Sequence, residues 1–518
     1  MTSATLPPEI ILEIIRKVDR VESTPAAQIA RVATLAALSR ACKDFYTFTE
    51  PYLYSRIEQI SEDGKELPLL LRTLLRKPCL GHFVKTFVGT CFRMNGIDMR
   101  PFRDLYSQLV SAGDWLLAMP TEWCPADFER RLDDIGSWAT KMQHGDWDAL
   151  TALLLCFLPN IEKFNLLGYT SVIGHPFITA LFGRAIWLQN HPGSDRHSYE
   201  EHPEFKKVMQ IWKSVPRMED LDFGMANLRQ VNIGFNNIKG YPLRGIFVRH
   251  VFRFIALKSV KIFSGHMMVG SQIPIPVLDL QITDLAIHHT AFVSGVSEPF
   301  LASFKRLKRL VCNMTHNFPI PDQQLAGFYE IDPPRVSGAI AHLSDSLEEI
   351  SLTQETCRDV VANPGAYFPL ESLASFGKLR KLEASAHVLL GRRPNIHGNQ
   401  GAPDDIVPPY QPQRIQHILN MFPESLESLS IVHCDPAIFG AITPFLVSRS
   451  GAPRKLVSIN LEFRPDLVVQ PSAREWSTCQ QLALKYGIKI KTFPANKIRS
   501  CSSCDYSSEL YQFHEARR

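Results

Sequence analysis

The sequence lacks the long apolar runs and the concentrated positive charge that would suggest a membrane or a nucleic acid as a partner. No run of about 18 apolar residues occurs, although a membrane-spanning helix needs about 20. The first apolar stretch contains Glu9 and Glu13 and follows no basic leader, so we expect no signal peptide. Lys and Arg number 56 against 52 Asp and Glu, and they form no dense block. We therefore expect no nucleic acid and no membrane among the partners.

The sequence also lacks the short motifs of common catalytic sites. It contains no G-x-x-x-x-G-K-[ST] phosphate loop, no G-x-G-x-x-G after a strand, no G-x-S-x-G elbow and no H-E-x-x-H zinc motif. We expect no enzymatic activity and no cofactor. An enzyme with an unrecognised site stays open as an alternative, and it would need a deep pocket with convergent titratable groups.

The cysteines form no disulfide framework and no complete metal site. The 11 cysteines are scattered along the chain, and this odd, dispersed set without a secretory signal is typical of reduced thiols in the cytoplasm or the nucleus. Cys501 and Cys504 have the spacing of half a zinc site, but no second pair follows and His514 would be a lone third ligand. We expect no bound metal.

The first 60 residues predict helices. Leu6-Pro7-Pro8-Glu9 suits a first helical turn, where the missing N–H groups of proline do no harm and a carboxylate meets the positive end of the helix dipole. Pro25 is expected to begin a further helix that Pro51 ends. Apolar residues at three- and four-residue steps define one face of each predicted helix: Ile10, Ile11, Ile14, Ile15 and Val18, then Leu35, Leu38, Cys42, Phe45 and Thr49.

Three blocks of this stretch, Leu6–Ile10, Leu38–Tyr46 and Pro51–Tyr54, resemble the F-box in order and spacing. The F-box is a helical module that docks on the Skp-type adaptor of cullin–RING ubiquitin ligases. The polar and alanine-rich stretch from Val21 to Thr34 is longer than in a compact F-box. The resemblance implies that the following residues contact the Skp-type adaptor or support the helices that do: Leu6, Pro7, Glu9, Ile10, Ile14, Leu38, Cys42, Phe45, Leu53 and Tyr54.

From Leu158 onward the chain repeats the pattern L-x-x-L-x-L. This repetition resembles a leucine-rich-repeat solenoid, which implies a parallel sheet on a concave face and helices outside. Uneven intervals between the matches predict an irregular solenoid with long insertions. The matches begin at Ile161, Met218, Leu228, Leu257, Ile282, Leu307, Leu347, Leu379, Leu426 and Leu456.

The register of each predicted strand indicates which side chains face a partner. The two leucines of each L-x-L point inward and the residue between them points outward, because strand side chains alternate. The outward residues carry both signs of charge, which favours a protein target over a phosphate backbone. The candidate target-binding residues on this face are Asp222, Asn232, Lys261, His288, Arg309, Ser351, Glu383 and Ser430.

The region between the two resemblances predicts a packed layer. Leu67–Leu75 predicts a helix, His82–Val88 a strand that would form the first rung, and Phe128–Trp138 another helix. Asp146 is expected to cap a helix over Trp147–Leu158 that is apolar on nearly every side and therefore buried. The polar stretches His191–Pro203 and Arg392–Gln413 are expected to be loops.

The expected fold class is α/β, in four parts: a helical F-box-like module (1–60), a helical linker or cap (61–157), an irregular repeat solenoid (158–493) and a polar tail (494–518). The function expected from the two resemblances is a substrate-recognition adaptor of a cullin–RING (SCF-type) ubiquitin ligase, with an unknown protein target. The alternative is a non-catalytic interaction scaffold whose helices only cap the open end of the solenoid.

Overall fold

The structure is a computed structural model, and its described residues divide into two compact units. The first is built mainly from Met1–Gly234 and Ile246–Leu257, and the second mainly from Lys258–Ser502. The described residues are 6–20, 25–59, 64–90, 97–100, 138–169, 178, 181–182, 185, 225–235, 251–252, 254–263, 266–267, 280–288, 291–292, 300–314, 332–354, 368–391, 410, 412–448, 453–463 and 472–494.

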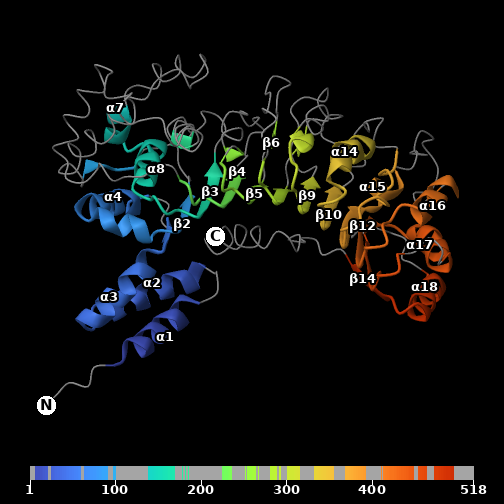
Figure 1. Cartoon of the computed structure of the whole chain (residues 1–518), viewed down its shortest axis with the longest axis horizontal. Coiled ribbons are helices and arrows are strands. Elements are labelled where there is room, and N and C mark those ends of the chain that lie inside the picture. The colour runs from blue at the N-terminus through green and yellow to red at the C-terminus, as the bar shows by residue number, and fades with distance from the viewer. Residues whose placement is uncertain are drawn as a thin grey trace, which may run out of the picture. The chain divides into compact units, whose positions relative to one another are not determined.

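The first unit begins with three helices that share a small core (Figure 1). They are α1 (Pro8–Asp19), α2 (Pro25–Ser39) and α3 (Lys43–Tyr54). The fully buried side chains of this core are Ile11, Ile15 and Leu35, and the partly buried side chains packed on them are Val18, Phe45, Phe48, Tyr52 and Leu53. We call α1, α2 and α3 the helical module. The helix predicted from Leu6-Pro7-Pro8-Glu9 is confirmed, because α1 begins at Pro8.

The prediction of one helix from Pro25 to Pro51 is wrong, because the chain turns at Arg40–Cys42. The amides of Arg40 and Ala41 donate to carbonyls only three residues back, and Cys42 is extended. The turn folds α3 back so that Phe45 packs on the core with Leu35. Pro51 does not stop α3, since it lies near the end of the helix and removes one hydrogen bond while the residues after it pack on the core.

The rest of the first unit adds strands and helices after the helical module. Its elements are β1 (Arg56–Glu58), α4 (Glu66–Arg76), the 3₁₀ helix η1 (Pro78–Phe83), β2 (Thr86–Thr90), α7 (Trp138–Gln143), α8 (Trp147–Cys156), β3 (Lys163–Tyr169) and β4 (Gln230–Phe235). The predicted cap is confirmed, because Asp146 accepts a hydrogen bond from the Ala149 amide at 3.0 Å. Every residue of α8 is buried, as its apolar sequence predicts.

Two predictions at the start of the sheet need correction. Only the last residues of His82–Val88 form a strand, since η1 occupies the first part. At Gly81 a Cβ atom would lie 1.8 Å from the Phe157 carbonyl oxygen, so this turn fits closely against the end of α8. β1 was not predicted, because Arg56–Glu58 was assigned to the helical module; it pairs in parallel with β2.

The second unit carries strands stacked in chain order. Its strands are β5 (Ser259–Phe263), β7 (Asp284–His288), β9 (Arg309–Met314), β10 (Glu349–Gln354), β11 (Lys381–Ser385), β12 (Ser428–Cys434), β13 (Ser458–Phe463) and β14 (Lys489–Pro494), with a separate short pair β6 (His266–Met267) and β8 (Ala291–Phe292). The 12-stranded parallel sheet formed by β1–β5, β7 and β9–β14 confirms the α/β class and a solenoid-like arrangement.

Each L-x-x-L-x-L match forms a strand except that at Met218, which lies outside the described residues. The predicted helix over Phe128–Trp138, the loops His191–Pro203 and Arg392–Gln413, and the polar tail also fall outside them, apart from a few residues at their edges.

The helices of the second unit follow the same stacking order as its strands. They are α14 (Pro333–Ile340), the 3₁₀ helix η6 (Ala341–Leu343), α15 (Ala386–Leu390), α16 (Pro412–Leu419), α17 (Ile438–Val447) and α18 (Ala473–Lys485). Each of α15, α16 and α17 contacts the helix that follows it, as Figure 1 shows at the orange and red end of the chain. Within the described part of the chain, no helix is both long and apolar enough to span a bilayer.

Candidate functional site

Arg31 holds the three helices of the helical module together, although nothing in the sequence pattern singles it out. Its side chain is only 4% exposed. The guanidinium donates to the Asp19 carboxylate at the end of α1, to the Tyr52 carbonyl at 2.9 Å and to the Ser55 hydroxyl at 3.2 Å after the end of α3. Because a buried cation needs such partners, this network fixes the ends of α1 and α3 against the middle of α2.

The residues that resemble the F-box divide between surface and core. Leu6 and Ile10 are 48% and 49% exposed. Pro7, Glu9 and Cys42 are also exposed, whereas Ile14 and Leu38 are half-buried. The half-buried side chains Phe45 and Leu53 pack on the core of the module, and Leu53 and Tyr54 also line a pocket. The structure therefore exposes only part of the predicted docking set, mainly around the start of α1.

Two further apolar side chains of α2, Ile29 and Val32, are exposed, and the sequence analysis did not single them out. They continue the three-residue steps of Leu35 and Leu38 toward the start of α2, so the spacing in the sequence gives no signal that they are exposed. On α3, the exposed Tyr46 adds an aromatic ring. Each helix of the module thus presents at least one large apolar side chain to the surface.

An ion pair joins the helical module to η1 within the first unit. Lys77 lies 2.5 Å from a carboxylate oxygen of Glu50, and the Tyr46 hydroxyl donates to the same oxygen at 2.7 Å. Burial by itself would raise the pKa of Glu50, but the hydrogen bonds from Lys77 and Tyr46 lower it below its ordinary value. The same contacts raise the pKa of Lys77. The ionised pair is therefore the stable form in the folded chain.

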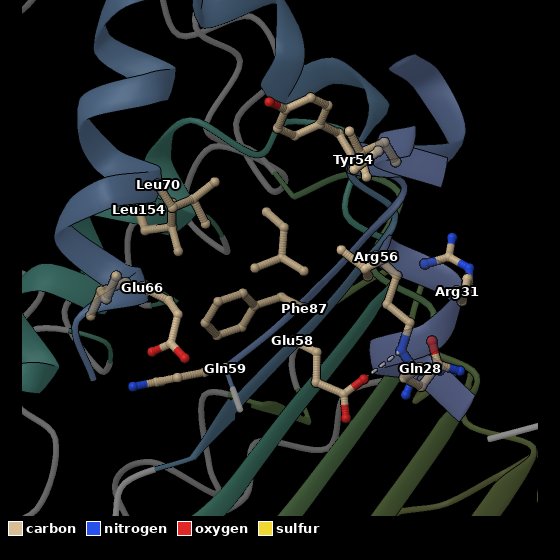
Figure 2. A pocket seen from close by; sticks show the side chains of 15 residues that line it. Gln28, Arg31, Tyr54, Arg56, Glu58, Gln59, Glu66, Leu70, Phe87 and Leu154 are labelled. Atoms are coloured by element: carbon tan, nitrogen blue, oxygen red, sulfur yellow. Dashed lines mark hydrogen bonds and ion pairs between the residues drawn. The ribbon is translucent and has the colours of Figure 1, made fainter. Parts of the chain in front are cut away.

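A pocket of about 450 Å³ lies between the helical module and the elements that follow it (Figure 2). Its walls come from α2, α3, β1, α4, β2 and α8. Two of its polar side chains pair with each other, because Arg56 lies 3.1 Å from Glu58. A third, Gln59, accepts a hydrogen bond from the Trp147 indole at 2.8 Å. The lining residues are Gln28, Arg31, Val32, Ala36, Leu53, Tyr54, Arg56, Ile57, Glu58, Gln59, Glu66, Leu67, Leu70, Phe87 and Leu154.

The predicted target-binding residues of the sheet are less exposed than expected. Asn232, His288 and Ser351 are buried, so the prediction that they face solvent is wrong. Asn232 donates to the Asn165 side chain at 2.8 Å, and Ser351 donates to Glu383 at 2.7 Å. Neighbouring strands therefore satisfy side chains that sequence reasoning left to solvent.

The other predicted residues of this face keep part of their surface. Arg309 is half-buried and pairs with Glu349 at 3.1 Å. Lys261, Glu383 and Ser430 are also half-buried. Asp222 lies outside the described residues. The face therefore offers both charged and hydroxyl groups that are partly exposed.

The described residues contain no group of three or more His, Cys, Asp or Glu side chains placed to hold a metal. Cys501 and Cys504 lie outside them. Burial raises the pKa of the Cys312 thiol to about 12 and that of Cys479 to about 11. The fraction of reactive thiolate at these two positions is therefore very small at neutral pH.

Comparison with known proteins adds no family to these observations. No family model matches the chain, and no curated protein matches its sequence. The functional argument therefore rests on the motifs of the sequence and on the geometry of the helical module, the pocket and the sheet.

Proposed function

We propose that the chain is a substrate-recognition adaptor of an SCF-type ubiquitin ligase. In this proposal the helical module binds a Skp-type adaptor, which connects the chain to a cullin, and the sheet binds an unidentified protein target. The observation that carries the proposal is that the module has its own buried core and still exposes Leu6 and Ile10 by about half.

The exposed side chains of Leu6 and Ile10, at and just before the start of α1, are suited to anchor a protein interface. Ile10 lies in the first turn of α1, and Leu6 lies just before Pro7, the residue that precedes the helix. Neither belongs to the core formed around Ile11 and Ile15, so the fold does not need them. A stable interface of about 1,200–2,000 Å² needs a few such apolar anchors within a polar rim, and Glu9 would lie in that rim.

The partly exposed side chains of Lys261, Arg309, Glu383 and Ser430 support the second half of the proposal. Mixed charges of this kind suit the polar surface of a protein better than a uniformly negative phosphate backbone. The chain would bind no cofactor and catalyse no reaction, and it would act by bringing its target close to the other subunits. Its place of action would be the cytoplasm or the nucleus.

One observation favours the alternative role as a cap of the sheet. β1 follows α3 after a single residue, Ser55, and pairs with β2 in the register Arg56 to Thr86. The helical module is thus attached directly to the first strand, as the terminal cap of a repeat array would be. In this role the module would protect the array and bind no Skp-type adaptor.

Co-purification with a Skp-type adaptor separates the two roles. The full chain is expected to capture the adaptor, and the double variant Leu6→Ala and Ile10→Ala is expected to lose about 100-fold in affinity, since two exposed anchors contribute about 3 kcal/mol. The control Leu69→Ala removes an equally exposed apolar side chain from α4 and should bind as the wild type does. If the wild-type chain captures no Skp-type adaptor, the adaptor role is wrong and the capping role is the one that stands.

A further inference from the structure

The pocket beside the helical module has the dimensions and composition of a small-molecule site. Its volume of about 450 Å³ falls within the range of about 300–1,000 Å³ that is usual for ligand pockets. Figure 2 shows Leu70, Leu154 and Phe87 on one side of it and Gln28, Arg31 and Arg56 on the other. Since it is built from six elements of one compact unit, its shape does not depend on how the two units are placed.

Both cations of the pocket lining are paired with a carboxylate. Arg31 is neutralised by Asp19, and Arg56 pairs with Glu58. Glu66 is the remaining carboxylate of the lining. A buried anion would lack a free cation among these lining residues, and a charged group of either sign loses its hydration on entering an apolar cavity. The electrostatics therefore favour an uncharged ligand.

Gln28 is a polar side chain of the pocket wall that can form a hydrogen bond with a ligand. The Gln28 side chain is 6% exposed and lines the pocket. Its carboxamide offers a ligand one acceptor oxygen and two donor hydrogens. In Figure 2 it lies beside the Arg56–Glu58 pair, opposite the apolar wall.

We infer that this pocket binds an uncharged amphipathic small molecule. The apolar body of the ligand would contact Phe87, Leu70 and Leu154, and a single hydrogen-bonding group would pair with the Gln28 carboxamide. The ligand would contact both α2 and α4 and would thereby stabilise the attachment of the helical module to the sheet. This inference does not require the module to bind a Skp-type adaptor, so the two proposals can fail separately.

The first test titrates the purified full chain with N-phenyl-1-naphthylamine, an uncharged fluorescent probe with an aromatic body and one N–H group. Saturable binding to one site with a blue-shifted emission is expected. Ala36→Phe places a ring in the pocket and should weaken binding at least tenfold. Ala37→Phe, one residue further along α2, changes an exposed position outside the lining and should leave binding unchanged.

A second pair of variants tests the inference independently, in case Ala36→Phe does not fold. Val32→Trp covers the pocket from an exposed position of its lining, and Ile29→Trp is the matched control, exposed on the same helix but outside the lining. Val32→Trp is expected to weaken probe binding at least fivefold while its circular dichroism melt matches that of Ile29→Trp. Gln28→Leu, which keeps the size but removes both hydrogen-bonding functions, should weaken binding about threefold to tenfold.

Two results would overturn the inference. One is that the wild-type chain shows no saturable binding of the probe. The other is that Val32→Trp, folded like its control, binds the probe as tightly as the wild type does. If the probe does not bind and Val32→Trp instead abolishes capture of a protein partner, the pocket receives a protein side chain and the small-molecule inference is wrong.

Discussion

The helical module and the sheet of the second unit reach stability in different ways. From β9 to β13 the same inward position recurs in register. Each buried side chain of the row therefore has a counterpart one strand away, and the row is Leu310, Ile350, Leu382, Leu429 and Ile459. The helical module has no such repetition. Its core has three fully buried side chains, and one buried cation, Arg31, joins its helices. Stability is therefore distributed along the sheet and concentrated in the module.

The largest effect should come from a cavity in the repeated row. Leu429→Ala removes a fully buried side chain from β12 and is expected to lower the free energy of unfolding of the second unit by about 3–4 kcal/mol. Urea denaturation followed by circular dichroism measures this loss. Ser430→Ala, at the half-buried outward position next to it, should cost less than about 1 kcal/mol. Equal losses in the two variants would contradict the assignment of the inward row.

Removal of Arg31, the buried cation of the helical module, should have a somewhat smaller effect on the free energy of unfolding. Arg31→Met leaves Asp19 and the Tyr52 carbonyl without their donor, and it is expected to cost about 2–3 kcal/mol because Asp19 keeps part of its hydration. Hydrogen exchange should show faster exchange in α1 and α3 and unchanged protection in β9–β13. Arg16→Met, on the exposed side of α1, is the control. Unchanged protection in α1 would show that the network does not hold the module together.

The smallest effect concerns the ion pair between α3 and η1. Lys77→Met should cost about 0.5–1 kcal/mol at pH 7, since the pair is partly exposed. The folded state lowers the pKa of Glu50, so its contribution is fully present above its ordinary pKa of 4.5 and is lost as the pH falls through the lower folded value.

The pH dependence of the free energy of unfolding shows whether Lys77 acts through its charge. The difference in stability between the wild type and Lys77→Met, measured by urea denaturation, should shrink as the pH is lowered from 7 to 3. Lys85→Met removes a more exposed partner of Glu162 and should have a smaller effect throughout. A difference that stays constant with pH would mean that Lys77 stabilises η1 by packing and not by charge.

Much of the secondary structure could be predicted because it depends on local signals. The prolines before α1, the Asp146 cap of α8 and the L-x-x-L-x-L motifs each fix an element over a few residues. β14 was missed because its sequence, Lys-Ile-Lys-Thr-Phe-Pro, lacks the leading leucines of the repeat. Its alternation of charged and apolar residues is nevertheless a strand signal.

The candidate site could be predicted only in part, since it depends on contacts between distant residues. Leu6 and Ile10 were identified from a motif at one end of the chain. The network of Arg31 joins positions 12 to 24 residues away, and the pocket brings Gln28 and Leu154 to one cavity. Neither arrangement leaves a period or a motif in the sequence.

The buried hydrogen bond between Asn165 and Asn232 has a consequence for how the chain folds. Parallel strands of similar composition can align in more than one way, and a slip of one residue would place an apolar neighbour of Asn232 opposite Asn165. The hydrogen bond between the two buried amides would then be lost, at a cost of about 1–3 kcal/mol. The Asn165–Asn232 pair thus favours the native alignment of β3 and β4, because a misaligned folding intermediate would lose this hydrogen bond. Leucines alone would discriminate less strongly between the two alignments.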